Sequence, residues 1–541
     1  MGIYLNQVGY LTSAKKVATT TTEGTYQVLD AETKRVVCMA KATSKGFDAA
    51  AGEDAFEVDF SALNKPGKYF LAGRGGQKSY TFEISDKPYA NLHKDLMKAL
   101  YFQRCGCELK AEHAGIYTHK ACHTTPAMLV EDYMAGTANP KTFDMTGGWH
   151  DAGDFGRYST AAAVALGHIL YAYELFPESF QDSLQIPESG NDMPDILNEC
   201  LYELQWLIKM QREDGGVYHK LTAWRHAPFL MPEEDLDPFL LYPVSSMAVA
   251  DYAAIMALAS KVYAEYRPEF AAQALAGAKK AWAWLEVNEY IGFHNPEGSG
   301  TGEYDDDDDR DERFWAALEM AKVDHANKEK YLAVAGKLIK EVSGIDFGWT
   351  DVSALGSMAV LTAKDSFPVD LAEEVEKTVF AEADRLLEIQ SKSGYGVAML
   401  PEDYVWGSNM VICNRGMLFL LCALGSESVK AEVYKEAALG QLHYLLGRNA
   451  VDYSYVTGHG EHAFKNPHNR PTACDGIEDP MPGWVSGGPF KTPVDEIAVK
   501  MIPKGTAPMK CFIDHVDSYS TNEITIYWNS PAIFMTAYFM K

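Results

Sequence analysis

The pattern of hydrophobic and polar positions divides the chain near residue 86. Before this point, apolar and polar residues alternate in short runs at 26–29, 56–60 and 80–84, with glycine- and proline-rich turns between them. Alternation with a period of two is typical of half-buried strands. Several short strands in so few residues predict a small antiparallel β-sandwich over residues 1–86.

From residue 87 almost to the end, the apolar residues recur with a helical period. In the segment 194–212 they fall three and four residues apart and stop before Gly215. The same period predicts helices at 89–112, 159–175, 194–212, 245–265, 268–286, 311–324, 327–342, 352–363, 369–391, 409–424, 429–446 and 521–540. About a dozen helices in one domain can close as six hairpins in a ring, so we expect a second, all-α domain over residues 87–541.

The charge balance narrows the range of partners. The 541 residues include 48 basic and 75 acidic side chains, which gives a net charge of −27. Such a surface argues against nucleic acids and anionic membranes as partners, but it does not repel a neutral substrate. No apolar run approaches the roughly 18 residues of a membrane span, so we expect no contact with a membrane.

Cysteine usage and the N-terminus bear on the compartment. Nine cysteines in a chain of 541 residues are too few for a disulfide scaffold, and the odd number leaves at least one free. The first residues lack the basic and apolar regions of a signal peptide. The localisation therefore stays open between a cytoplasmic enzyme and a secreted one whose leader has been removed.

A glycine-rich loop at 147–158 contains two carboxylates three residues apart, Asp151 and Asp154. Gly153 between them permits a tight bend, so both acids can point at one place. A carboxylate pair of this kind can hold a water molecule and take its proton, which is the general-base half of a hydrolysis. The alternatives are a polar turn or part of a calcium site.

A second candidate carboxylate, Glu523, precedes a strongly apolar segment near the C-terminus. Partial burial would raise its pKa and keep it protonated as a general acid. Alternatively, Ser520 and Glu523 fit a capping box, in which the glutamate only satisfies a helix N-terminus. The acidic block 305–309 is expected to be a solvated loop before a helix, with a calcium site as its alternative.

A third group has the composition of a metal site. It consists of Cys105, Cys107, Cys122, His123 and His150. Two thiolates and two imidazoles would form a closed tetrahedral zinc site of the structural kind. Buried free cysteines with hydrogen-bonded histidines are the alternative. Because His150 directly precedes Asp151, zinc would tie the glycine-rich loop 147–158 to the helix predicted around residues 100–110.

Several long motifs in order resemble glycoside hydrolase family 9, the cellulase family with an N-terminal immunoglobulin-like domain. The resemblance covers essentially the whole chain. Residues 4–10 resemble the opening strand of that domain, and 148–154 match the loop of the nucleophilic water. Residues 512–530 fit the family's acid signature, and 454–470 follow its substrate-binding signature. One departure is His462, where the family usually has Asn, Lys or Arg.

The resemblance implies a fold and a set of roles. The fold would be an immunoglobulin-like β-sandwich followed by a six-hairpin (α/α)6 toroid. Asp154 would be the general base, Asp151 would help to hold the water, and Glu523 would be the general acid. His468 and Arg470 would bind the sugar at the cleaved bond. The candidate stacking residues are Trp149, Tyr519, Trp315 and Trp406.

The resemblance also implies metals. The zinc ligands would be Cys105, Cys122, His123 and His150, with Cys107 left as the spare thiol. Calcium is common in the family, and Glu188, Asn191 and Asp195 could supply ligands, with a plain helix-capping loop as the alternative. No organic cofactor is expected.

We therefore expect an inverting hydrolase of β-1,4-glucosidic bonds that acts as a monomer on a glucan or oligosaccharide. An inverting pair must leave room for a water, so the carboxyls of Asp154 and Glu523 should lie about 6.5–9.5 Å apart. An endoglucanase is the first expectation. An exo-acting β-glucosidase, cellobiosidase or glucosaminidase on short oligosaccharides is the alternative, with a non-catalytic carbohydrate-binding protein as a remote third. Exo action would require a blocking loop, for which 218–243 and 296–311 are candidates.

Overall fold

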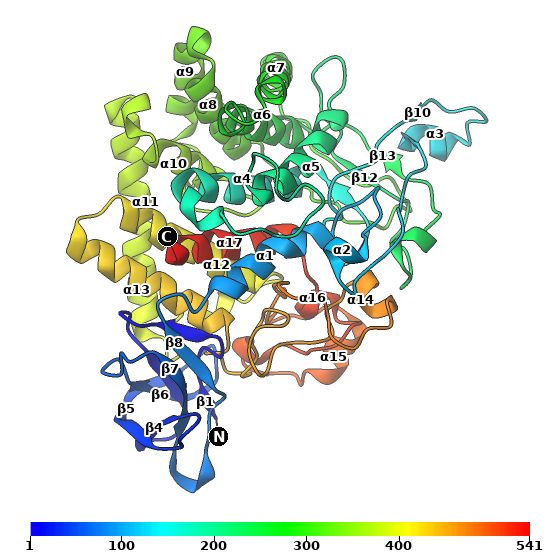
Figure 1. The fold of residues 1–541 in the computed structure, drawn as a ribbon. Helices are drawn as coiled ribbons and strands as arrows, with labels where there is room; N and C mark the ends of the chain where they lie inside the picture. Colours follow the sequence, from blue (N-terminus) through cyan, green and yellow to red (C-terminus); the bar gives the residue numbers. More distant parts are fainter. Residues whose placement is uncertain (1) are drawn as a thin grey trace. The chain divides into compact units, whose positions relative to one another are not determined.

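A computed structural model describes residues 2–541 (Figure 1). The chain divides into two compact units. The first unit comprises the chain up to Ala99, together with Ala381–Thr472 and Ile477–Lys541. The second unit comprises Leu100–Phe380 and Ala473–Gly476. The boundary predicted between residues 86 and 87 does not coincide with this division, because the N-terminal strands group with the last third of the chain.

The N-terminal strands form one eight-stranded sheet in the order β1-β3-β6-β5-β4-β7-β8-β2. Their bounds are Ile3–Tyr4 (β1), Gly9–Leu11 (β2), Val17–Thr20 (β3), Thr25–Asp30 (β4), Val36–Asp48 (β5), Glu53–Asp59 (β6), Gly67–Ala72 (β7) and Phe82–Ser85 (β8). The long β5 pairs with β4 through its first half and with β6 through its second. The β2–β8 pair is parallel, so the predicted antiparallel arrangement has one exception.

The core of the strands is aromatic and aliphatic, and it includes Tyr10, Val28, Val58, Phe82 and Ile84. Tyr10 meets Phe82 edge-to-face at 5.3 Å between ring centroids. The apolar positions of the alternating pattern in residues 1–86 are therefore the ones that form the buried core of the N-terminal strands.

Polar contacts join the strands to the rest of the first unit. Arg448 Nε donates to Thr19 Oγ1 at 3.0 Å, and the Gly394 N–H donates to Asp48 Oδ2 at 2.8 Å. The backbone N–H of His462, the residue that departs from the family signature, donates to Gln7 Oε1 at 2.8 Å. His462 thus belongs to a loop that contacts the N-terminal segment.

Each predicted helical segment contains a helix. Those of the first unit include α12 (Ser408–Leu424), α13 (Ser428–Leu445) and α17 (Ile526–Met540), while α1 (Ala90–Phe102) and α11 (Val369–Lys392) cross the division between units. α17 is buried along almost its whole length, which explains why its sequence is apolar on every side. Three short helices are also present: α14 (Arg470–Cys474), α15 (Glu496–Met501) and α16 (Tyr519–Asn522).

The second unit contains the remaining long helices. They are α4 (Ser159–Leu175), α5 (Asp195–Met210), α6 (Ser246–Val262), α7 (Pro268–Leu285), α8 (Arg310–Val323), α9 (Lys328–Leu338) and α10 (Ser353–Leu361). α6 packs against α4, α7 and α8, and α8 also packs against α9 and α10. α2 (Ala111–Ala114) and α3 (Val130–Ala135) are short additions.

A second, five-stranded sheet in this unit was not predicted. Its order is β10-β9-β13-β12-β11, with bounds Thr142–Phe143, Ala127–Leu129, Leu240–Leu241, Lys220–Thr222 and Arg157–Tyr158. Strands of two or three residues are too short to establish a period, so the hydrophobic pattern could not reveal them. The loop 147–158 ends in β11, which pairs with β12. The sheet therefore connects this loop to the residues that follow β12.

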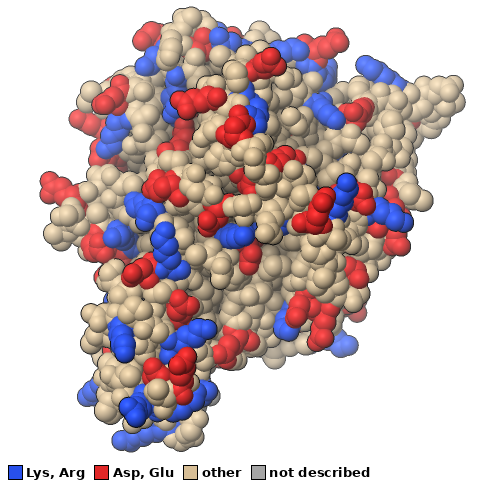
Figure 2. Space-filling view, viewed as in Figure 1, with Lys and Arg blue, Asp and Glu red and all other residues tan. Residues whose placement is uncertain are grey.

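Within residues 2–541, no helix has the length and apolar character that crossing a membrane requires. On the face drawn in Figure 2, acidic and basic side chains are interspersed, with no broad basic patch.

Candidate active site

The acidic loop of the second unit is fixed by its glycines and by a buried arginine. Gly148 adopts φ +77°, and a Cβ at this position would meet the Trp206 ring at 2.7 Å. Arg157 donates to the carbonyl oxygens of Met145 at 2.8 Å and Gly147 at 2.5 Å. The loop therefore requires glycine for conformation and for space, and its start is held to β11.

Asp151 is enclosed by the protein. It is 2% exposed, and the Tyr304 hydroxyl donates to its Oδ2 at 2.5 Å. Its Oδ1 is also buried and has no hydrogen-bond partner among residues 2–541. Burial, reinforced by the charge of Asp154, raises the pKa of Asp151 to about 8.

Asp154 lies nearer the surface and has a different partner. Its side chain is 9% exposed, and its Oδ2 lies 3.0 Å from Nδ1 of His226. The pair of carboxyls thus divides into one enclosed by the protein and one in reach of solvent. That difference suits two carboxyls that perform different tasks.

The four predicted zinc ligands meet at one point. The ligand atoms of Cys105, Cys122, His123 and His150 all lie within 4.8 Å of one another. Cys105 Sγ is 3.5 Å from His123 Nδ1, Cys122 Sγ is 3.9 Å from His150 Nε2, and the two ring nitrogens are 3.4 Å apart.

These separations are those of tetrahedral zinc. Zn–S bonds of about 2.3 Å and Zn–N bonds of about 2.05 Å at the tetrahedral angle place S and N roughly 3.6 Å apart and two nitrogens roughly 3.4 Å apart. His123 Nε2 also lies 3.3 Å from Asp235 Oδ2, the carboxylate–histidine arrangement that orients metal ligands. The residues fit zinc. Cys107 stays outside the group, as predicted.

Glu523 of the first unit occupies the C-cap of α16 and is half-buried. The capping-box alternative is wrong, because the N-cap of α17 is Thr525, whose Oγ1 accepts from the Trp528 N–H at 3.1 Å. The backbone of Glu523 pairs with that of His468 in a parallel bridge, and its carbonyl accepts from the Gly487 N–H at 2.8 Å. Glu523 is therefore not needed to begin a helix.

The structure brings the predicted sugar-binding residues of the first unit close to Glu523. His468 Nδ1 lies 2.6 Å from the Val516 carbonyl oxygen, and its ring is 5.9 Å from that of Tyr519. The rings of Tyr519 and Trp406 are 5.5 Å apart and are 37% and 42% exposed. Two exposed aromatic rings beside a carboxyl form a surface on which a sugar face can stack. Arg470 begins α14 and is buried.

Two predicted stacking residues are core residues instead. Trp149 is 1% exposed, and its indole N–H donates to Glu199 Oε1 at 2.8 Å. Trp315, on α8, is fully buried, and its indole N–H donates to the Tyr171 hydroxyl at 3.3 Å. The prediction that these rings stack on sugars is wrong, because neither face is accessible.

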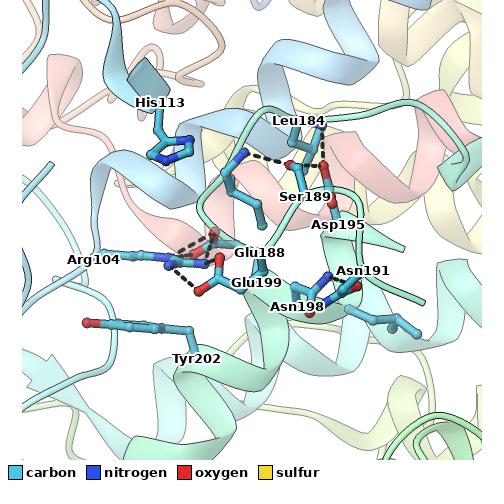
Figure 3. Close-up of polar contacts among 12 residues, drawn as sticks. Arg104, His113, Leu184, Glu188, Ser189, Asn191, Asp195, Asn198, Glu199 and Tyr202 are labelled. Carbon is cyan, nitrogen blue, oxygen red and sulfur yellow. Dashed lines mark hydrogen bonds and ion pairs between the residues drawn. The ribbon is translucent and has the colours of Figure 1, made fainter. Parts of the chain in front are cut away.

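The predicted calcium ligands have separate partners. Figure 3 shows Arg104 between the carboxylates of Glu188 and Glu199, with Glu188 bound bidentately at 3.1 and 2.9 Å. Asn191 pairs with Asn198, and Asp195 Oδ2 accepts from the Leu184 N–H at 2.7 Å. The contacts are those of a polar loop before α5, and calcium at this place is not shown. The alternative, a helix-capping loop, is not supported either, because the N-cap of α5 is Pro194 and makes no side-chain cap.

The acidic block 305–309 is only partly the solvated loop that we expected. Asp308 binds Arg310 at the start of α8 through its carboxylate. Asp306, in contrast, is half-buried, and burial next to Asp311 raises its pKa to about 7.

Sequence reasoning missed two residues that touch the acidic pair, Tyr304 and His226. They lie 153 and 72 residues from their carboxylate partners along the chain. No local spacing could reveal them. The signal in the sequence is that both lie in 218–243 and 296–311, the candidate segments for blocking the cleft.

The family model described as glycosyl hydrolase family 9 matches residues 89–536, and the cellulase N-terminal ig-like domain matches residues 1–78. A cellodextrinase from Butyrivibrio fibrisolvens is 43% identical, and the match covers 98% of each chain. This chain therefore has relatives of its own length.

Solved structures agree. A single mutant of a thermostable endoglucanase from Alicyclobacillus acidocaldarius superposes with a TM-score of 0.91 at 33% identity, covering 100% of this chain and 99% of that one. A Zn-binding triple mutant of the family 9 endoglucanase J30 gives 0.91 at 30% identity, covering 98% and 100%. The predicted fold, an immunoglobulin-like domain followed by an (α/α)6 toroid, is confirmed. The chain belongs to glycoside hydrolase family 9.

Proposed function

We propose that this glycoside hydrolase cleaves β-1,4-glucosidic bonds with inversion, using Asp154 as the general base and Glu523 as the general acid. The observation that carries the proposal is the state of the acidic pair. Asp151 Oδ1 is buried and has no hydrogen-bond partner among residues 2–541. The more accessible Asp154 follows three residues later in the chain. We assign Asp151 Oδ1 to holding the water whose proton Asp154 removes.

Glu523 completes the reaction by protonating the leaving oxygen. It is half-buried, and it is not used to cap α17. His468, Arg470, Tyr519 and Trp406 would bind the sugar on the same side, since the rings of His468, Tyr519 and Trp406 follow one another at 5.9 and 5.5 Å. Tyr519 and Trp406 then hold sugar faces, and His468 supplies a polar contact.

The substrate is a neutral β-1,4-linked glucan, and the net charge of −27 disfavours polyanionic polysaccharides. An endoglucanase remains the first assignment, in agreement with the endoglucanases among the similar structures. Short oligosaccharides form the second candidate, because the relative with 43% identity over the full length is a cellodextrinase.

Product analysis separates the two assignments. Cellohexaose is digested while the viscosity of a soluble cellulose derivative is followed. A rapid fall in viscosity with mixed products identifies endo action, and release of one short sugar at constant viscosity identifies exo action.

Zinc would be held by Cys105, Cys122, His123 and His150, which leave no open ligand position. When bound, it supplies a structural cross-link and no chemistry of its own. His150 precedes Asp151 directly, so the cross-link would fix one end of the acidic loop to Cys105, which follows α1.

A further inference from the structure

His226 is a solvent-facing histidine that contacts Asp154, the more accessible carboxylate of the pair. Its side chain is 43% exposed, that of Asp154 is 9% exposed, and Nδ1 lies 3.0 Å from Asp154 Oδ2. An ionised carboxylate has only acceptor positions, so the hydrogen of this bond belongs to Nδ1. The bond therefore occupies Oδ2 of Asp154 and restrains the rotation of its carboxylate.

Residues 223–226, which carry His226, are held by pairing with the segment around Gly300. The Gly300 N–H donates to the Trp224 carbonyl oxygen at 3.0 Å, and Arg225 forms a parallel bridge with Gly300. Gly298 adopts φ +90° and lies against the Trp224 ring, with 3.6 Å from its Cβ position to Cζ2. Residues 223–226 and 298–304 thus form one paired structure.

This paired structure contacts both carboxyls of the loop 147–158. One of its segments presents His226 to Asp154, and the other presents the Tyr304 hydroxyl to Asp151 at 2.5 Å. A displacement of either segment would change the geometry at both acids.

Lys220, at the start of β12, binds the second of the two paired segments and the residues just before it. Its Nζ donates to Asn295 Oδ1 at 2.6 Å, Thr301 Oγ1 at 3.0 Å and the Gly302 carbonyl at 2.6 Å. Burial lowers the pKa of Lys220 to about 7, against the opposing charges of Asp154 and Glu303. Within the second unit, the charged or titratable groups that face the Asp154–His226 pair are therefore Asp151, Lys220 and Glu303.

We propose that His226 is a positioning residue for the general base. It fixes the rotation of the Asp154 carboxylate and favours its ionised form, because a donor to the charged form of an acid lowers the acid's pKa. The inference rests on the assignment of Asp154 in the proposed function.

The test compares two substitutions at one position. In His226→Asn, the amide nitrogen replaces Nδ1 and keeps the donor; in His226→Phe, the ring remains and the donor is lost. We expect His226→Phe to lower kcat about 10–100-fold, the effect of losing one hydrogen bond to a charged group. KM should change by less than about threefold, and the acid limb of the kcat/KM profile should move up by about one pH unit.

His226→Asn should stay within about threefold of the wild type, with the acid limb in its place. His325→Asn and His325→Phe, at an exposed histidine of the same unit, serve as matched controls. Melting temperatures of all variants show whether the fold is intact. A merely structural role would lower the melting temperature without moving the acid limb.

Three outcomes would overturn the inference: an unchanged pH profile in His226→Phe, equal impairment of the Asn and Phe variants, or an effect on KM alone. Asp154→Ala, measured in parallel, distinguishes failure of the His226 proposal from failure of the assignment of Asp154 as the general base. Full activity in Asp154→Ala would refute the assignment of Asp154 as the general base. An inactive Asp154→Ala together with a normal His226→Phe would refute only the role proposed for His226.

Discussion

The loop that carries Asp151 and Asp154 and the segment that carries Glu523 are organised differently. Each carboxyl of the loop is held by a side chain from a distant segment, Tyr304 or His226, and the loop also contains His150 of the predicted zinc site. Glu523 is placed by backbone pairing with His468 and Gly487.

The difference matches the tasks that we assign. A base must present one oxygen to a water in a fixed direction, so rotation of its carboxylate has to be restrained. An acid must deliver a proton to an oxygen whose position the bound sugar sets, so placing the segment beside the sugar-binding residues is the main requirement. The comparison therefore predicts different sensitivities in the two regions.

Asp154→Ala should give the largest loss. We expect kcat on cellohexaose to fall about 10²–10⁴-fold, because a positioned general base contributes this much, with KM changed only a few-fold. The loss should be the same for substrates with good and poor leaving groups, since the base acts on the water. Steady-state kinetics on both kinds of substrate provide the measurement, and wild-type turnover would refute the assignment.

Glu523→Gln should give a loss that depends on the leaving group. On cellohexaose we expect a similar fall of about 10²–10⁴-fold, because the leaving oxygen needs a proton. On a dinitrophenyl cellobioside, whose leaving group departs without one, the variant should stay within about tenfold of the wild type. Equal losses on the two substrates would mean that Glu523 does not act as the acid.

Loss of a zinc ligand should disturb the base-bearing loop more than the acid-bearing segment. We expect Cys122→Ser to lower the melting temperature by about 5–10 °C, because a structural metal contributes several kcal/mol. Bound zinc, measured by elemental analysis, should fall from about one per chain to none. The matched control is Cys107→Ser, at the neighbouring thiol outside the quartet. If both variants behave alike, the quartet is a set of free thiols and imidazoles.

The smallest effect concerns acid stability. Burial in α4 lowers the pKa of His168 to about 3, against an ordinary value of 6.5. As the pH falls below 6.5 the unfolded chain takes up this proton first, so stability is complete above pH 6.5 and is lost towards pH 3.

His168 alone should contribute a slope of about 1.4 kcal/mol per pH unit in that window. In His168→Gln the urea midpoint should therefore depend less steeply on pH between 6.5 and 4. A slope equal to that of the wild type would show that His168 is charged in the folded protein.

The hydrophobic pattern was sufficient for the helices and the larger strands, because a period over ten or more residues depends on burial of one face. The segment predicted at 159–175 has the bounds of α4 itself. The predicted segment 89–112 was too long, since α1 ends at Phe102 and the residues after it turn towards the metal quartet. The short strands β11, β12 and β13 carry no period of their own.

For the site, motif spacing predicted the acids and four metal-ligand candidates, and the fold brings the four metal-ligand candidates together. It could not distinguish accessible rings from core rings, so the buried Trp149 and Trp315 were assigned wrongly, and the roles of the exposed Trp406 and Tyr519 stay predictions. It also could not find His226, because contact between two distant loops depends on the pairing of residues 223–226 with 298–304. Burial and long-range pairing are properties of the folded chain.

The most direct test of the proposed inverting mechanism is the anomeric form of the first product. Cellohexaose is hydrolysed in the NMR tube, and the anomeric proton of the new reducing end is followed before mutarotation equilibrates it. Attack by water from the face opposite the leaving oxygen predicts that the α-anomer appears first. Initial appearance of the β-anomer would mean that a carboxylate of the protein attacks the sugar, which would contradict the roles assigned to Asp154 and Glu523.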